Sequence, residues 1–140
     1  MRTAIDSNVL SALWSNESVA SNAEESLSRA QSEGGLVVSA PVYAEILAHP
    51  KITESLLNDF LADTSIEVDF ELGRDVWLDA GRRFALYAKR RRRVTHDNPK
   101  RLLADFIIGS HALIQADRLM TLDTRRYERD FPELKRISVP

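Results

Sequence analysis

Four acidic residues stand where a carboxylate could take part in chemistry, and two of them follow predicted strands. Asp6 comes directly after a short apolar stretch at residues 3–5, and Asp123 follows another at residues 119–122. Ligands of open α/β sheets bind beyond the carboxyl ends of the strands, so both positions suit a functional site. Each carboxylate also has a structural alternative, which is to cap the helix predicted to follow it.

Asp105 lies within a strongly apolar predicted helix. Its neighbours at helical spacing include Ile108 and Gly109, which predicts that this face packs closely against a sheet. A buried carboxylate without compensation is costly, so a partner is expected. The structural alternative to a functional role is an ion pair with Arg101 or another arginine. If the helix begins at Pro99, Asp105 lies beyond its first turn, where the helix dipole gives little stabilisation.

Glu45 lies in the middle of a predicted helix whose N-cap is Ser39. A capping box would place the acid three residues after the cap, so Glu45 has no capping role. Its structural alternatives are a contact with His49 or plain exposure to solvent.

Together the four carboxylates predict a shared site. Such a cluster repels itself unless protons or a cation compensate it, and hard oxygen ligands favour Mg²⁺ or Mn²⁺. Zinc would prefer thiolates or paired imidazoles, but the chain has no cysteine, and its three histidines show no ligand spacing. His111 is expected to be a packed or hydrogen-bonded helix residue.

Strands alternating with helices predict an α/β fold with a mostly parallel sheet, in a single domain spanning residues 1–140. The strands are predicted at residues 3–5, 36–38, 66–68, 119–122 and 137–139, and the helices at residues 8–14, 19–31, 39–47, 52–61, 72–89, 102–116 and 124–129.

Composition excludes several classes of protein. With 44% apolar and 29% charged residues the chain is typical of a globular domain, and its formal net charge of −2 argues against coating nucleic acid by bulk positive charge. The early carboxylate at residue 6 argues against a signal peptide, and no apolar run is long enough to span a bilayer. We therefore expect a cytoplasmic protein without a membrane partner.

One stretch is strongly basic. Lys89, Arg90, Arg91, Arg92 and Arg93 are consecutive and precede a predicted exposed loop at residues 94–99. Contact with an RNA backbone is favoured, and the alternative is a solvated helix end, where cations also suit the helix dipole. Trp14 and Trp77 are expected in the core, although Trp14 could instead line a groove for a partner.

The acidic positions and their surroundings resemble the PIN-domain family, and VapC-type toxins in particular. The resemblance covers nearly the whole chain, and residues 52–96 match only in length and helical character. The resembling motifs are Ile5-Asp6-Ser7-Asn8-Val9-Leu10, residues 39–47 with Glu45 as the acid, residues 104–113 with Asp105, and residues 117–123 ending in Asp123 and followed by Tyr127 and Phe131-Pro132.

The resemblance implies a three-layer α/β/α PIN-like fold with a central, mostly parallel sheet. It also implies an Mg²⁺- or Mn²⁺-dependent endoribonuclease, a toxin that pairs with a VapB-like antitoxin and forms a homodimer. Asp6 and Asp105 would be the main metal ligands, with Glu45 and Asp123 completing the catalytic set. Whether Glu45 ligates the metal or orients the attacking water stays open, as do the number of metal ions, the RNA target and the antitoxin.

Two further expectations concern the surroundings of the metal. Ser7 and Thr121 are expected to support the ligands by hydrogen bonds. Loss of one carboxylate should abolish most turnover without unfolding the domain, and Asp105→Asn is expected to stabilise the metal-free protein by removing repulsion.

Other functions fit less well. A phosphatase with a nucleophilic aspartate needs a second aspartate where Asn8 stands, and a response-regulator receiver needs an early acidic pair and a late lysine that are not evident. A dinucleotide-binding domain would show a G-x-G-x-x-G turn, which the chain lacks. The remaining alternative is a PIN scaffold that has lost catalysis and only binds protein, against which the four acids argue.

Overall fold

A five-stranded parallel sheet forms the centre of the chain. The computed structural model describes residues 1–15, 17–93 and 101–140. The strands pair in the order β3-β2-β1-β4-β5, and every pairing is parallel. Their bounds are β1 Thr3–Ile5, β2 Leu36–Ser39, β3 Glu67–Asp69, β4 Arg118–Thr121 and β5 Arg136–Ser138.

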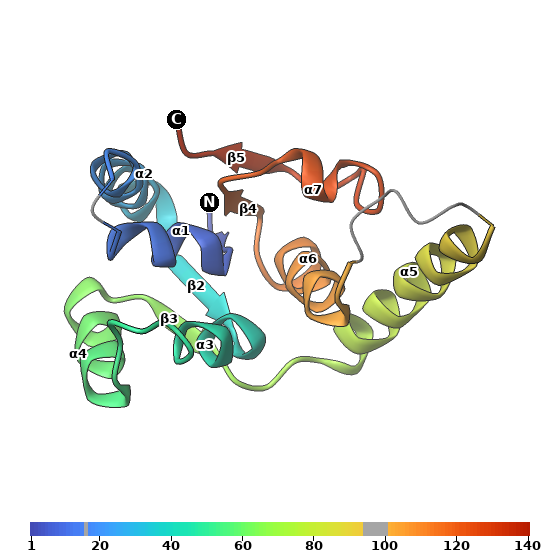
Figure 1. Cartoon of the computed structure of the whole chain (residues 1–140), viewed down its shortest axis with the longest axis horizontal. Coiled ribbons are helices and arrows are strands. Elements are labelled where there is room, and N and C mark those ends of the chain that lie inside the picture. The colour runs from blue at the N-terminus through green and yellow to red at the C-terminus, as the bar shows by residue number, and fades with distance from the viewer. Residues whose placement is uncertain (16, 94–100) are drawn as a thin grey trace.

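Helices cover both faces of this sheet. Figure 1 shows α1 and α2 on one side of the strands and α6 and α7 on the other, with α5 outside α6. The three-layer α/β/α prediction is therefore confirmed. The helices are α1 Ser7–Leu13, α2 Val19–Gly34, α3 Ala40–Ile46, α4 Glu54–Thr64, α5 Arg74–Arg92, α6 Leu103–Gln115 and α7 Arg125–Glu128.

The chain reverses its direction across the sheet between β1 and β4. From β1 it moves outward through β2 to β3, and then it crosses back to place β4 on the other side of β1. Right-handed crossovers then place the helices of the two halves on opposite faces. The carboxyl ends of β1 and β4 therefore lie at a topological switch point, where α/β sheets open a crevice for ligands.

The core consists of the apolar strands and the inner faces of the helices. β1, β2 and β4 are buried at every residue, as expected for strands covered on both sides. In α6, Gly109 faces Phe131, and a Cβ atom at this glycine would lie 2.5 Å from the phenyl ring. Phe131 in turn packs against Phe106 and Tyr127, with ring centroids 6.1 Å away in both cases. This aromatic cluster joins α6 to the segment around α7.

The predicted elements are all present, with some differences in detail. The helix predicted at residues 102–116 is present as α6, which begins at Leu103, so Asp105 sits in its first turn and not beyond it. Trp77 was predicted to lie in the core but is 52% exposed. Trp14 is partly buried and packs edge-on against Phe60, with ring centroids 5.3 Å apart. None of the helices within the described residues is long and apolar enough to cross a membrane.

Candidate active site

Asp6 occupies the carboxyl end of β1, at the switch point. It is the N-cap residue of α1, but its side chain makes no capping hydrogen bond. Its Oδ2 atom instead accepts hydrogen bonds from the hydroxyls of Thr121, at 3.0 Å, and Tyr127, at 2.8 Å. The residue is only 4% exposed. Burial raises the pKa of Asp6 above its ordinary value, and the two hydroxyl groups offset part of this increase.

The Thr121 hydroxyl is fixed as a donor to Asp6. Its oxygen accepts hydrogen bonds from the Asn8 side-chain amide and from the backbone N–H of Asp123, both at 3.2 Å. A hydroxyl has one proton and two acceptor positions, so its remaining capacity is to donate. Asn8 is held in turn by the backbone N–H of Leu122, which donates to its Oδ1 atom at 3.2 Å. This network fixes the orientation of the Asp6 carboxylate.

Tyr127 supports the same oxygen from α7. Its side chain is fully buried. Burial, followed by the charge of Asp6, raises the pKa of Tyr127, so the phenol stays protonated and donates its hydrogen bond. Asp6 is thus held by two neutral donors.

Glu45 reaches the site from α3. The residue as a whole is exposed, but its carboxyl group is affected by its surroundings. Partial burial raises the pKa of Glu45, and the negative charges of Asp6 and Asp105 raise it further. The Ser7 hydroxyl hydrogen-bonds to Glu45 and, like the charge of Arg126, lowers this pKa. Mutual repulsion among three acids is the electrostatic sign that their carboxylates converge.

Positively charged groups stabilise the carboxylate of Asp105. It is 6% exposed and lies in the first turn of α6, where the helix dipole favours a negative group. Nη2 of Arg126 lies 2.8 Å from its Oδ1 and 2.9 Å from its Oδ2. Oδ2 also accepts the backbone N–H of Leu102 at 3.2 Å, and Nε of Arg101 lies 3.6 Å away. The ion pair expected as a structural alternative is therefore present, mainly to Arg126.

Asp123 has a different environment from the other three acids. It is exposed, and its Oδ1 atom accepts the backbone N–H of Arg125 at 3.2 Å. This contact forms a turn that leads into α7, whose N-cap is Thr124, so Asp123 is not the capping residue that the sequence offered as its structural alternative. The structure therefore places Glu45 within range of the charges of Asp6 and Asp105, with Thr121 bonded to Asp6 and Ser7 beside Glu45.

The carboxylate oxygens are ligands that suit a hard divalent cation, but the three side chains do not surround a single position. Three carboxylates from β1, α3 and α6 supply oxygen ligands of the kind that Mg²⁺ and Mn²⁺ prefer. The pKa values of Asp6 and Glu45 are raised, so the folded protein disfavours the negative charge of both side chains. Within the described residues, however, no three acidic or histidine side chains are close enough to hold one ion. The guanidinium group of Arg126 instead contacts both carboxylate oxygens of Asp105.

The basic run lies at the C-terminal end of α5, and members of it, including Arg90 and Arg92, have partners within the chain. Arg90 pairs with the buried Asp130 at 2.8 Å. Asp130 also pairs with Arg101 at 3.3 Å, which connects the end of α5 to the neighbourhood of Asp105. Lys89, Arg92 and Arg93 are exposed. The loop predicted at residues 94–99 lies outside the described residues.

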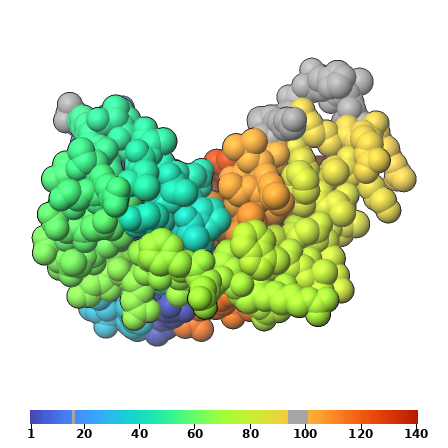
Figure 2. Space-filling model, turned by 90° about the horizontal axis from the view of Figure 1, so that it is seen from below, coloured from blue at the N-terminus to red at the C-terminus, as the bar shows by residue number. Residues whose placement is uncertain are grey.

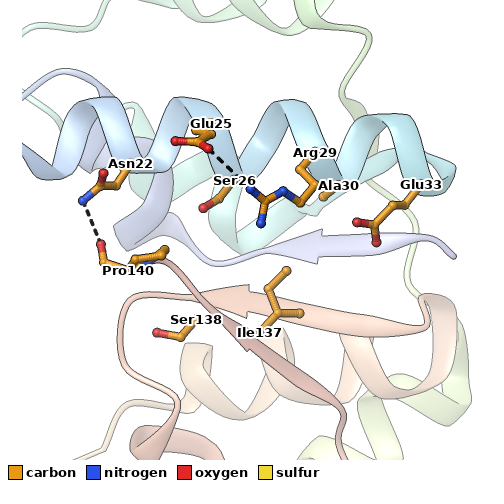
Figure 3. Close-up of a pocket in the computed structure, with 9 residues that line it drawn as sticks. All are labelled: Asn22, Glu25, Ser26, Arg29, Ala30, Glu33, Ile137, Ser138 and Pro140. Carbon is orange, nitrogen blue, oxygen red and sulfur yellow. Dashed lines mark hydrogen bonds and ion pairs between the residues drawn. The ribbon is translucent and has the colours of Figure 1, made fainter.

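The molecular surface is hollowed near these elements. Figure 2 shows a notch between the teal segment that includes α3 and the orange surface of α6, with red C-terminal atoms at its base. A separate pocket lies between α2 and β5 and is lined by residues such as Arg29, Glu33 and Ile137 (Figure 3). None of the site carboxylates lines that pocket.

Sequence reasoning did not assign roles to Arg126, Tyr127 and Asn8. Asn8 was considered only as part of a motif and as an argument against a phosphatase, and Tyr127 only as part of a motif. Because α7 spans four residues, it has too little periodicity to indicate which of its side chains face inward. The roles of Arg126 and Tyr127 follow only from the packing of α7 beside β1 and α6. His111, by contrast, is buried and hydrogen-bonded as expected, 2.8 Å from Asp69.

Comparisons with known proteins agree with this architecture. The PIN domain family model matches residues 3–132. No curated protein matches the chain in sequence.

Solved structures with the same fold include three toxin–antitoxin complexes. VapBC2 from Rickettsia felis, bound to a DNA fragment from its promoter, aligns over 100% of both chains, with a TM-score of 0.70 and 17% identity. VapBC-1 from nontypeable Haemophilus influenzae aligns over 99% of this chain and 98% of its own, with a TM-score of 0.67 and 20% identity. A complex from Klebsiella pneumoniae covers the same shares, with a TM-score of 0.65 and 18% identity.

Proposed function

The chain belongs to the PIN domain family, and on this premise we propose that it is a metal-dependent endoribonuclease, the toxin of a VapBC-type toxin–antitoxin pair. The observation that carries the proposal is the convergence of Asp6, Glu45 and Asp105 at the switch point of the sheet. The charges of Asp6 and Asp105 both raise the pKa of Glu45, which supports a common site that a cation would stabilise.

The proposed reaction is hydrolysis of an RNA phosphodiester bond. Asp6 and Asp105 would hold Mg²⁺ or Mn²⁺, with Glu45 as a further ligand or as the group that orients the attacking water. A bound ion would supply a water of lowered pKa and would neutralise charge that develops on the phosphate. The chain itself contributes orientation, because Thr121 and Tyr127 fix the Asp6 carboxylate and Ser7 hydrogen-bonds to Glu45.

RNA is the proposed substrate because of the resemblance and the basic end of α5. Lys89, Arg92 and Arg93 are exposed there and are available to phosphates. Arg91 belongs to the same proposed RNA-contacting run, whereas Arg90 contributes mainly through its pair with Asp130.

The proposed partners are a VapB-like antitoxin and a second copy of this chain. The three structural neighbours are toxin–antitoxin complexes, which supports an antitoxin partner. Large apolar side chains are exposed on α5 and near the start of α6, including Trp77, Leu86 and Leu102. Such side chains suit a protein interface. Light scattering of the purified chain, alone and with its candidate antitoxin, would test both partners.

Cleavage of RNA by the purified chain tests the function. We expect activity with Mg²⁺ or Mn²⁺, loss of activity with a chelator, and loss in Asp6→Asn. Asp59→Asn is a matched control, because Asp59 is an exposed acid on α4. Full activity of Asp6→Asn, or activity that survives the chelator, would contradict the proposal. The alternative, an inactive scaffold, predicts no Mn²⁺ binding in calorimetry and no cleavage by the wild-type chain.

A further inference from the structure

One arginine interacts with all three carboxylates of the site. The charge of Arg126 lowers the pKa of both Asp6 and Glu45. Although partial burial opposes it, the ion pair with Asp105 raises the pKa of Arg126 itself. The side chain projects from α7, the short helix that also carries Tyr127. Arg126 is therefore placed where a bound cation would otherwise be expected.

The contact with Asp105 uses both carboxylate oxygens. A single nitrogen, Nη2 of Arg126, lies 2.8 Å from Oδ1 and 2.9 Å from Oδ2. The backbone of α7 is held in place as well, because Nη1 of Arg101 donates to the carbonyl oxygen of Arg126. A metal ion that ligates Asp105 would have to take at least one of these oxygens from the guanidinium group.

Repulsion would oppose the binding of both cations at once. Two like charges a few ångströms apart repel each other strongly near a protein surface, and a divalent ion doubles the effect. Displacement and repulsion act in the same direction, against the metal.

We propose that Arg126 is an internal competitor of the divalent metal for Asp105, and that it sets the metal affinity of the site. In the metal-free protein Arg126 holds Asp105 and partly compensates Asp6 and Glu45. Metal binding requires Arg126 to release Asp105, so the guanidinium group weakens the metal relative to a site without it. This inference rests on the metal site of the proposed function.

Calorimetric titration with Mn²⁺ alone, in the absence of RNA, tests the competition. We expect Arg126→Gln to bind Mn²⁺ about tenfold more tightly than the wild-type chain, since an opposing charge is removed next to the ion. Arg126→Lys keeps the charge but loses the planar guanidinium group, so a smaller gain is expected. Arg125→Gln removes the same charge from the same helix at an exposed position and should leave the dissociation constant unchanged.

The outcomes separate this inference from the proposed function. If the wild-type chain binds Mn²⁺ and Arg126→Gln binds it no more tightly, the competition is refuted and the metal site stands. An equal gain in Arg125→Gln would also refute it, because the effect would then be general electrostatics. If neither the wild-type chain nor Arg126→Gln binds Mn²⁺, both proposals fail. Should Arg126→Gln not fold, Arg126→Lys decides, and a dissociation constant equal to that of the wild-type chain overturns the inference.

Discussion

The two ends of the site stabilise their carboxylates in different ways. At the end of β1, Asp6 is buried and held by the neutral hydroxyls of Thr121 and Tyr127. At the start of α6, Asp105 is held by the guanidinium group of Arg126 and by the helix N-terminus. Neutral donors orient a carboxylate but leave its charge uncompensated, whereas an arginine compensates the charge and occupies the oxygens. The carboxylate of Asp105 is therefore in a direct ion pair, whereas the carboxylate of Asp6 is bonded to neutral groups.

The largest expected effect is loss of RNA cleavage, and it should be similar for Asp6 and Asp105. Asp6→Asn and Asp105→Asn should each lower RNA cleavage by at least about a hundredfold, because both remove a proposed metal ligand. Asp123→Asn should cost much less, since Asp123 is exposed and its Oδ1 atom bonds to the backbone N–H of Arg125. Initial rates of RNA cleavage at saturating Mg²⁺ measure the effects. If Asp123→Asn lowered the rate of RNA cleavage as much as Asp6→Asn, Asp123 would be a catalytic residue as well.

The neutral end can be weakened without touching a carboxylate. Tyr127→Phe removes one of the two hydroxyl donors to Asp6, and we expect cleavage to fall about tenfold and stability by about 1 kcal/mol. Tyr43→Phe is the matched control, because the Tyr43 hydroxyl donates to the Oδ1 atom of Asn58, at 3.0 Å, and not to a carboxylate. Cleavage assays and thermal melts report the two effects. Equal activity of the two variants would show that the Tyr127 hydroxyl does not orient Asp6.

Stability of the metal-free protein should separate the two ends. Asp105→Asn is expected to destabilise the fold by about 1–2 kcal/mol, because it breaks a charged hydrogen-bonded pair whose arginine is 41% exposed. This revises the sequence-based expectation that Asp105→Asn stabilises. Asp6→Asn should instead leave stability unchanged or raise it, since burial penalises the Asp6 charge. Denaturant melts in a chelator give both values, and changes of the same sign would remove the contrast.

The repulsion among the acids should appear as a pH dependence. The pKa of Glu45 is raised above its ordinary value of 4.5, so its charge destabilises the folded state at neutral pH. This penalty disappears as the pH falls through the folded-state pKa toward 4.5. Metal-free Glu45→Gln should therefore melt above the wild-type chain at neutral pH, and the difference should close on acidification. A difference that stays constant with pH would argue against convergence of the three acids.

The smallest effect extends the contrast to the basic end of α5, where Arg90 pairs with a buried acid and Lys89 and Arg93 are exposed. Neutralising the exposed Lys89 and Arg93 should make the salt dependence of RNA binding shallower by about 0.7 per contact, without loss of stability. Arg90→Gln should chiefly lower stability, because Arg90 pairs with the buried Asp130. Filter binding across a salt series gives the slopes. An unchanged slope would remove these residues from the RNA interface.

The sequence predicted the elements and much of the site because both depend on local pattern. Short apolar runs marked all five strands, and acids placed just beyond a strand or within an apolar helix identified Asp6 and Asp105. The role of Asp123 was harder to predict, because an acid after a strand can face the crevice or cap the next helix. Tertiary packing decides between these outcomes. The exposure of Trp77 and the contact of Arg126 with Asp105 likewise depend on neighbours that helical spacing alone does not define.

Gly109 shows how far the site depends on a residue without a functional group. A methyl group there would lie 2.5 Å from the ring of Phe131, which is fully buried and cannot easily move. Phe131 packs against Tyr127, whose hydroxyl orients Asp6. In a survey of random variants, Gly109 should therefore rank among the intolerant positions, although it touches no reacting atom. Sequence drift in this protein is restricted by shape as well as by charge.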